Sequence, residues 1–373
     1  MIRSFIASLK KVIILLSFST LFFSCLEAQI IYAPVSNKTH SRRSESSFIK
    51  LKSGNILQIY SRFKASNDDH AVAELVKIQI SPDGKRVLGK EESIIQKPNG
   101  NVMSPSLLRL QDGRIMLFYL QKEMTAGVIV CRLVMRYSHD ECQTWSPETV
   151  VTKGPVYCVV VNDSVIQLRN GRICVPVSQY RYTHNSGLDT RGVVYCLYSD
   201  DLGKSWKESK SLLSIPDYIR SLTGYQEPVI AETTSGSLLM YMRTDLGYLY
   251  KTTSSDGGNT WSNPVADKTF PTVVAPAKIF KKSNNHLLML FNKSPLPVPV
   301  RNSWNRSILS VKISKDNGKT WQDSMVLENE KNKNFAYPSL IEIEDGVFLC
   351  SYHMSTAKEY FFWHIKTRYI TIK

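Results

Sequence analysis

Short apolar runs alternate with polar turn sequences along most of this chain. Five runs with the composition of β-strands lie at residues 75–80, 133–137, 193–198, 249–254 and 308–313, and read LVKIQI, LVMRY, VVYCLY, LYKTTS and ILSVKI. Each run is followed at once by a polar segment rich in Ser, Asp and Gly. Runs of this length bounded by turn residues predict β-strands joined by hairpins.

The polar segments are copies of one motif, Ser-x-Asp-x-Gly-x-Thr-Trp, which we call the Asp-box. Clear copies occupy residues 138–145, 199–206, 254–261 and 314–321, and a shortened copy occupies residues 81–85. The serines at 81, 138, 199, 254 and 314 are 57, 61, 55 and 60 residues apart. Asp accepts hydrogen bonds from nearby amides, Gly takes a positive φ, and Trp packs on the neighbouring strand. The motif therefore predicts a tight turn that recurs at a nearly constant interval.

A second kind of turn lies between the Asp-boxes. Residues 51–57, 110–116, 168–174 and 344–348 carry Ser-Gly, Asp-Gly or Asn-Gly pairs between apolar residues, which is typical of hairpins. Two hairpins in each period make a four-stranded sheet, and such sheets repeated at this interval are propeller blades. About 345 residues after the first 28, divided by a period of about 58, give roughly six blades. The sequence predicts an all-β, six-bladed β-propeller over residues 29–373, with one blade completed by the N- and C-terminal strands.

The first 28 residues have the pattern of an export signal. Basic residues precede an apolar run at 12–23, and small residues follow up to Ala28. We expect cleavage after Ala28 and a secreted or periplasmic protein. The alternative is a lipoprotein signal, in which Cys25 becomes the lipidated first residue and anchors the chain at the cell surface. Phe22, Phe23 and Ser24 fit such a lipoprotein signal poorly. Beyond this segment no stretch is apolar for long enough to cross a bilayer.

Cysteine usage and charge limit the classes of partner. Six cysteines follow the signal, without a CxxC pair or a His/Cys cluster of zinc spacing, and most lie in apolar runs. We expect buried thiols, and neither a metal nor an organic cofactor is indicated. The net charge of +15 becomes +12 or +13 without the signal and favours anionic partners. Basic runs interleaved with aromatics are absent, so we expect no nucleic acid partner, and we expect a monomer.

Propellers with Asp-boxes resemble the sialidase, or neuraminidase, superfamily, and the resemblance spans nearly the whole chain after the signal. It implies three arginines that clamp a carboxylate, a Glu/Tyr pair as nucleophile and an Asp as acid/base. In the segment RRSES, Arg42 or Arg43 resembles the first of these arginines, although the Ile-Pro that usually follows it is missing. In the segment NDDHA, Asp68 or Asp69 resembles the acid/base. The spacing favours Asp68, and a solvated acidic loop is the alternative for both. His70 beside them is a candidate for either a catalytic or a substrate contact.

The remaining members of the set follow in order. Glu227 in GYQEP resembles the glutamate that activates the nucleophile, and Arg243 in MRTD resembles the second arginine. Arg306, eight residues before the last Asp-box, resembles the third, with Arg301 as its competitor. Tyr337 in FAYPSL resembles the nucleophile. A neutral phenol avoids the repulsion that a carboxylate nucleophile would meet beside an anionic sugar, and sialidases are the glycosidases that use tyrosine.

The resemblance implies an exo-acting glycoside hydrolase whose partner is an anionic glycan or glycoconjugate, with exo-α-sialidase chemistry as the first choice. The missing Ile-Pro and the segments NDSVIQL, QEP and MRTDLG fit a divergent branch of the superfamily. Two alternatives therefore remain open: action on a polysaccharide that contains uronic acids, and a glycan-binding propeller without turnover. Residues 103–106 together with Asn162 and Asp163 are candidates for specificity, with strand packing as an equal alternative.

Overall fold

The computed structural model describes residues 29–372, except residues 126, 155, 184–186, 297–299 and 357–360. The regular structure in this part of the chain is all β. None of its helices is long and apolar enough to cross a membrane. The predictions of an export signal and of lipidation at Cys25 fall on residues outside the described part.

Strands that follow each other in sequence pair antiparallel into sets. The first three sets are β2 (Arg42–Lys50), β3 (Ile56–Phe63), β4 (Ala73–Ile80) and β5 (Val87–Ile95); β6 (Asn101–Arg109), β7 (Ile115–Thr125), β8 (Val128–Ser138) and β9 (Thr149–Val150); and β10 (Tyr157–Val159), β11 (Ile166–Gln167), β12 (Ile173–Tyr180), β15 (Val193–Ser199) and β16 (Lys207–Glu208). A small hairpin of β13 (Tyr182–Thr183) and β14 (Gly187–Leu188) projects from the third set. Single parallel pairs, Ala73 with Asn101 and Tyr157 with Cys131, join these three sets into one continuous sheet.

The remaining sets are separate four-stranded sheets. They are β17 (Gln226–Glu232), β18 (Leu238–Arg243), β19 (Tyr248–Ser254) and β20 (Val265–Pro271); β21 (Lys278–Lys281), β22 (Leu287–Asn292), β23 (Ile308–Ser314) and β24 (Gln322–Asn329); and β25 (Lys333–Glu344), β26 (Val347–Thr356), β27 (His364–Thr371) and β1 (Gln29–Tyr32). In the last sheet the N-terminal strand β1 pairs with β27 near the C-terminus, as the sequence predicts for the terminal strands.

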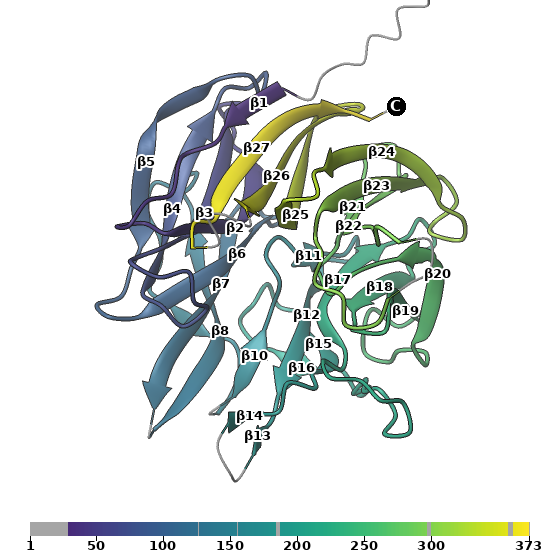
Figure 1. Cartoon of the computed structure of the whole chain (residues 1–373). Helices are drawn as coiled ribbons and strands as arrows, with labels where there is room; N and C mark the ends of the chain where they lie inside the picture. Colours follow the sequence, from purple (N-terminus) through teal and green to yellow (C-terminus); the bar gives the residue numbers. More distant parts are fainter. Residues whose placement is uncertain are drawn as a thin grey trace, which may run out of the picture.

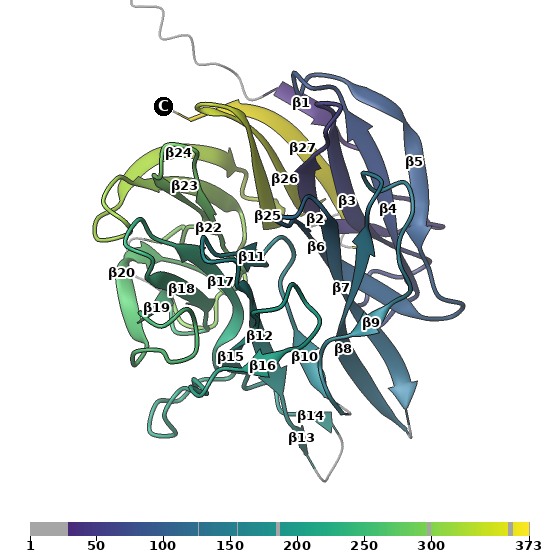
Figure 2. The ribbon, with the colours of Figure 1, turned by 180° about the vertical axis from the view of Figure 1, so that it is seen from behind.

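The sets are arranged about a common centre, with their first strands inward (Figures 1 and 2). The first strands of neighbouring sets contact each other: β2 contacts β6, β17 contacts β21, β21 contacts β25, and β25 contacts β2. The contact between β2 and β25 brings the beginning of the chain against its end. These contacts bring segments that are distant in sequence side by side.

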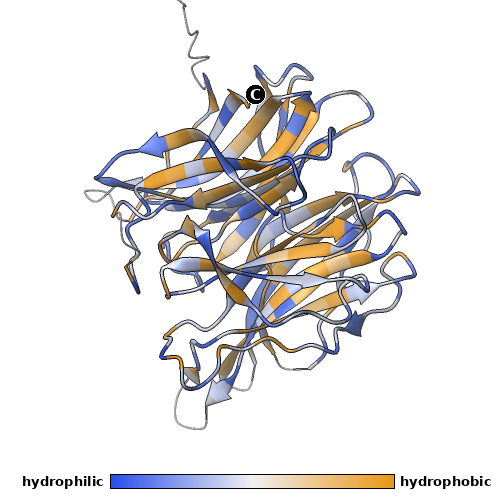
Figure 3. Ribbon diagram, turned by 90° about the vertical axis from the view of Figure 1, so that its right-hand side faces the viewer, coloured by the Kyte–Doolittle hydropathy of each residue, from blue (hydrophilic) through white to orange (hydrophobic). Residues whose placement is uncertain are grey.

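Burial follows this arrangement. Strand β2 is buried at eight of its nine positions, whereas the outer strands β5 and β24 are mostly exposed. Apolar residues gather along the strands and polar residues in the turns (Figure 3). Hydrophobic clusters fill the space between adjacent sheets, and one of them joins Phe48 and Val76 of the first set to Leu349 and Ile365 of the last. The second strands β18 and β22 are buried at every position, and burial of both faces explains why they read as nearly continuous apolar runs.

The Asp-boxes form the turns between the last two strands of their sets, which confirms the predicted hairpin turns. In each clear copy the serine hydroxyl donates to the aspartate, and it accepts a hydrogen bond from the amide at the fifth position, with N···O distances of 2.8 to 2.9 Å. The fifth position has a positive φ in all four copies, and it holds Cys142 in the first copy and Gly203, Gly258 and Gly318 in the others. The glycine of the motif is therefore explained by backbone conformation.

Replacing Gly318 by alanine is expected to destabilise the fold by about 1–2 kcal/mol, because its φ is +80° and a Cβ would lie 2.4 Å from a methyl group of Leu239. Gly113, with a φ of +89° and nothing within 4 Å of an added Cβ, is the matched control. Gly113→Ala introduces only the backbone strain, so the additional loss of stability in Gly318→Ala measures the clash with Leu239. Chemical denaturation of both variants tests this, and equal losses would show that Leu239 moves aside without cost.

The six cysteines of the described chain are buried free thiols, which confirms the sequence prediction for them. Cys142, at the fifth position of an Asp-box, shows how one of them replaces a glycine.

Candidate active site

A cavity of about 480 Å³ opens at the centre of the molecule, between the first strands of several sets. Its walls combine apolar side chains, including Met103, Leu120 and Val159, with ionisable ones. The ionisable residues that line it are Glu45, Asp69, Lys122, Tyr157, Tyr180, Glu227, Arg243, Arg306, Tyr337 and His353. Such a mixture of apolar walls and convergent charges is typical of a ligand site.

A repeated backbone irregularity aims side chains into this cavity. Glu45, Ser104, Asp163, Glu227 and Tyr337 all have positive φ values, between 44° and 56°. Glu45, Ser104, Glu227 and Tyr337 lie where the pairing register shifts in β2, β6, β17 and β25. A bulge of this kind interrupts the alternation of a strand and redirects a side chain, and non-glycine residues with positive φ gather at functional sites. All four of these bulge residues line the cavity.

The five residues with positive φ follow the sequence repeat. Positions 45, 104, 163, 227 and 337 are separated by 59, 59, 64 and 110 residues, the last being about two periods. Ser or Pro comes directly after each of them, at positions 46, 105, 164, 228 and 338. This periodic signal could have identified Glu45, which the sequence prediction of site residues missed.

Tyr337 and Glu227, the predicted nucleophile pair, are in direct contact. The Tyr337 hydroxyl donates to Glu227 Oε1 at 2.8 Å, and the other oxygen, Oε2, accepts from Arg243 Nη1 at 2.5 Å. Burial and the Glu227 carboxylate raise the pKa of Tyr337 well above its usual value, against the opposing effect of Arg243 and Arg306. The phenol is therefore protonated in the free site, and the carboxylate beside it is placed to accept its proton.

Arg306 lies on the same side of the cavity. Its Nε and Nη2 both donate to the Val274 carbonyl, at 3.1 and 2.9 Å, and its guanidinium carbon lies 5.8 Å from the centre of the Tyr337 ring. Trp304 packs against Arg243 and Arg306, whose guanidinium carbons lie 5.2 and 5.5 Å from the centre of its ring. Arg301, the competitor in sequence, is exposed and reaches the Arg220 carbonyl outside the cavity.

His353, Trp304 and Trp363 also line the cavity and were not predicted from sequence. The His353 ring lies between Tyr337 and Trp363, with ring centres 5.3 and 4.6 Å away. Burial, reinforced by Arg42 and Arg306, lowers the pKa of His353 well below its usual value. This histidine is therefore a neutral ring that packs against Tyr337.

The predicted acidic loop brings Asp69, but not Asp68, to the cavity. Asp69 Oδ1 accepts from Arg42 Nη1 at 2.5 Å, and Lys122 Nζ donates to the Asp69 carbonyl at 2.8 Å. Asp68 is exposed and caps the amide of His70, while the His70 ring lies 3.1 Å from the Tyr157 hydroxyl. Desolvation raises the pKa of Asp69, but Arg42 and Lys122 outweigh it and hold that pKa well below the usual range.

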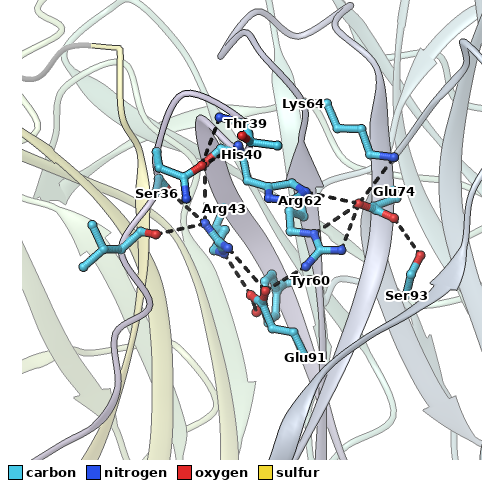
Figure 4. Close-up of polar contacts among 12 residues, drawn as sticks. Ser36, Thr39, His40, Arg43, Tyr60, Arg62, Lys64, Glu74, Glu91 and Ser93 are labelled. Carbon is cyan, nitrogen blue, oxygen red and sulfur yellow. Dashed lines mark hydrogen bonds and ion pairs between the residues drawn. The ribbon is translucent and has the colours of Figure 1, made fainter.

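Arg42 and Arg43 are adjacent in β2 and point in opposite directions. Arg42 is 1% exposed and reaches towards Asp69 and Glu45 behind the cavity wall. Arg43 joins a separate polar network between β2 and β5, where Glu91 accepts from Arg43, Arg62 and Tyr60 (Figure 4). Arg43 therefore stabilises the first sheet and does not reach the cavity.

This network makes the stability of the fold depend on pH. Although desolvation raises the pKa of Glu91, hydrogen bonds from Arg43 and Tyr60 outweigh it and lower that pKa to about 2. Because the pKa of Glu91 is lower in the folded than in the unfolded protein, ionised Glu91 stabilises the fold fully at pH values above the unfolded pKa of about 4.5. This stabilisation is lost as the pH falls through about 2. We expect Glu91→Gln to cost about 1–2 kcal/mol at pH 6, with the difference from wild type shrinking towards pH 2.

Urea unfolding of wild type and Glu91→Gln at several pH values between 6 and 2 measures this difference. Glu92, whose 65% exposed side chain pairs with Lys77 at 3.3 Å, provides the control variant Glu92→Gln. If the difference in unfolding free energy between wild type and Glu91→Gln stays constant with pH, Glu91 does not have the lowered pKa in the folded protein.

The candidate specificity residues divide into two groups. Met103 and Ser104 line the cavity, whereas Ser106 caps the Ser164 amide at 2.8 Å. Asn162 Nδ2 donates to the Ser46 carbonyl at 2.7 Å, and Asp163 pairs with Lys278 at 2.7 Å. Asn162 and Asp163 thus tie first strands together beneath the cavity. Among the described residues, no group of three or more His, Cys, Asp and Glu side chains is arranged to hold a metal ion.

The strand arrangement is all β, and the family match and relatives described next make the chain a member of the sialidase-like superfamily. The model of the BNR repeat-like domain family matches residues 58–350, so the chain belongs to that family.

Among its relatives, a sialidase of Bacteroides fragilis (strain YCH46) is 26% identical over 238 residues, which are 61% of this chain and 40% of the relative. A sialidase of Micromonospora viridifaciens is 24% identical over 310 residues, 75% of this chain and 45% of the relative. An anhydrosialidase of Macrobdella decora is 34% identical over 143 residues, 36% of this chain and 16% of the relative. The chain thus spans less than half the length of each of these relatives.

Solved structures share the fold. A protein of unknown function from Dyadobacter fermentans superimposes with a TM-score of 0.74 at 20% identity, over 93% of this chain and 98% of that one. A leech intramolecular trans-sialidase, solved with 2,7-anhydro-Neu5Ac, has a TM-score of 0.68 at 16% identity, over 92% of this chain and 70% of that one.

Proposed function

We propose that this protein is an exo-acting glycoside hydrolase that releases a terminal anionic sugar, with sialic acid in α-linkage as the first candidate. The observation that carries the proposal is the Tyr337 hydroxyl held 2.8 Å from Glu227, between Arg243 and Arg306. The names of the related sialidases and anhydrosialidase support the same chemistry.

The proposed reaction retains anomeric configuration. Arg243 and Arg306 bind the sugar carboxylate, since guanidinium groups match carboxylates in geometry and charge. As the Tyr337 oxygen bonds to the anomeric carbon, Glu227 takes the phenolic proton. Asp69 must first take up a proton from solvent, because Arg42 and Lys122 favour its carboxylate, and in its neutral form it protonates the departing oxygen. Water then displaces Tyr337 from the glycosyl-enzyme, with Asp69 acting as base and Glu227 returning the proton to Tyr337. The neutral phenol meets no repulsion from the substrate carboxylate.

We further propose that the strand sets are the blades of a closed, six-bladed propeller. Three observations support closure: β1 pairs with β27, β2 contacts β25, and the hydrophobic cluster around Phe48 and Leu349 joins the first set to the last. Small-angle X-ray scattering would report the expected round particle and its monomeric mass.

Export to the periplasm or the exterior is part of the proposal and rests on the N-terminal sequence pattern alone. Cell fractionation, with N-terminal sequencing of the mature protein, would distinguish cleavage after Ala28 from lipidation at Cys25.

A substrate panel tests the proposed function. It contains a 4-methylumbelliferyl sialoside, sialylated glycans and polysaccharides with uronic acids, because the same arginine pair would accept a uronic acid carboxylate. Release of sialic acid is the expected result. Cleavage confined to the uronic acid polysaccharides would show that the substrate sugar is a uronic acid and not sialic acid. Binding of sialic acid without release would show that the protein is a lectin and not a hydrolase.

A further inference from the structure

The guanidinium of Arg42 is almost fully engaged within the protein. Nε donates to Ser44 at 2.8 Å, Nη1 donates to the Asn67 carbonyl and to Asp69 at 3.1 and 2.5 Å, and Nη2 donates to Glu45 at 2.7 Å. An arginine has five N–H donors, so these four hydrogen bonds leave one. Both faces of the group are also covered, with Phe63 at 4.2 Å and Trp363 at 4.3 Å from ring centre to guanidinium carbon.

Binding a substrate carboxylate in the bidentate way needs two parallel N–H groups that face the ligand. Arg42 has one N–H left, is 1% exposed and does not line the cavity. Arg243 and Arg306 do line it. In the described part of the chain, Arg243 has one recorded hydrogen-bonding nitrogen and its buried Nε has no partner, while Nη1 of Arg306 has no recorded partner. The guanidinium donors of this set that an incoming anion can reach therefore belong to Arg243 and Arg306.

We propose that Arg42 is a positioning residue that holds Asp69, that Glu45 fixes Arg42 in this role, and that the substrate's anionic group is bound by Arg243 and Arg306 without Arg42. The inference rests on the proposed function for its substrate, but the state of Asp69 is measurable without one. The site is thus a two-arginine clamp for a single carboxylate, and Arg42 and Glu45 form a separate ionic cluster with Asp69, the proposed acid/base.

Glu45 is suited to fixing Arg42 because, within the described part of the chain, it has no other strong partner. Its side chain is 1% exposed, and apart from Arg42 it accepts only long hydrogen bonds, from Ser104 at 3.2 Å and Ser61 at 3.4 Å. Removing Arg42 from this carboxylate would leave a buried charge unpaired, which is strongly unfavourable. Asp69, in contrast, is 57% exposed at the cavity, so its contact with Arg42 fixes a side chain that would otherwise sample several rotamers.

The charges around Asp69 come from several elements. The groups that face it or act on it are Arg42 and Glu45 on β2, Lys122 on β7, Cys131 on β8, Tyr157 on β10, Tyr337 on β25, His353 on β26, and His70 and Arg306 from loops. Arg42 and Lys122 are the cations that contact Asp69 directly. Removing Arg42 should therefore favour the protonated form of Asp69, and Arg306, which is farther away, should have little effect on it.

The first test needs no substrate. The Asp69 carboxyl is titrated by ¹³C NMR in protein labelled at aspartate, with Asp69→Asn to assign its signal. The variant Arg42→Gln/Glu45→Gln removes one charge of each sign and so avoids an unpaired buried carboxylate. We expect the midpoint for Asp69 to rise by one to three pH units in this variant. Arg306→Lys, the control, should leave it unchanged.

The second test separates positioning from binding by kinetics on the best substrate of the panel. In Arg42→Gln/Glu45→Gln we expect KM within about threefold of wild type and a displaced pH profile, whereas Arg306→Lys should raise KM about tenfold or more without that displacement. A midpoint for Asp69 that does not move, or a tenfold rise in KM with an unchanged pH profile, would overturn the proposal. If wild type cleaves nothing in the panel, the proposed function fails, and the NMR titration still decides the role of Arg42.

Discussion

Tyr337→Phe is expected to lose about 10³-fold or more in kcat while folding normally. The substitution removes the oxygen that attacks the anomeric carbon and leaves the ring packed against His353. Because Glu227 keeps its ion pair with Arg243 at 2.5 Å, its carboxylate is not left unpaired. A loss in kcat with little change in thermal stability is the signature of a reacting group.

The measurement is initial-rate kinetics on the substrate that wild type cleaves, with the circular dichroism spectrum and melting temperature recorded for each variant. Tyr180→Phe is the matched control, since Tyr180 also lines the cavity and also loses a hydroxyl. We expect its kcat to stay within about tenfold of wild type. If Tyr337→Phe were as active as Tyr180→Phe, Tyr337 would not be the nucleophile.

Lys278→Met is expected to destabilise the protein by about 3–5 kcal/mol, because it leaves a buried carboxylate without its cation. Lys278 Nζ lies 2.7 Å from Asp163 Oδ2, and the two side chains are 10% and 11% exposed. Asp163 also accepts from the Ser47 hydroxyl and the Leu340 amide, at 2.8 and 3.3 Å. The ion pair therefore ties together first strands from the beginning, middle and end of the chain.

Chemical denaturation of a double-mutant cycle isolates this pair. The double variant Asp163→Asn/Lys278→Met removes both charges, so it should recover a large part of the stability that Lys278→Met loses. If the two losses simply add, the ion pair makes no contribution of its own, and the inner strands are held together by packing.

The strand pattern was predictable from sequence because turn chemistry and spacing are local properties. Each Asp-box needs a serine, an aspartate and a residue with positive φ at fixed positions, and these recur whatever packs around them. The order of Glu227, Arg243, Arg306 and Tyr337 along the repeat also predicted residues that the structure gathers at one cavity.

The sequence could not predict which of two adjacent residues of the same type faces the site. Successive side chains of a strand point to opposite faces, so the sequence alone does not tell whether Arg42 or Arg43 faces inward. The same holds for Asp68 and Asp69 in their loop, where spacing favoured Asp68 and the structure brings Asp69 to the cavity. Glu45 escaped prediction because a bulge breaks the alternation on which sequence patterns depend, and Lys122 and His353 because isolated residues in apolar strands carry no motif.

Covalent labelling is the most direct test of the central claim, that Tyr337 attacks an anionic sugar held in this cavity. A fluorinated analogue of the cleaved sugar, whose glycosyl-enzyme hydrolyses slowly, is incubated with the protein, and the adduct is located by mass spectrometry of peptides. The account predicts one sugar per chain on Tyr337, and none in Tyr337→Phe. Labelling of a different residue, or cleavage of the natural substrate with inversion of anomeric configuration, would contradict it.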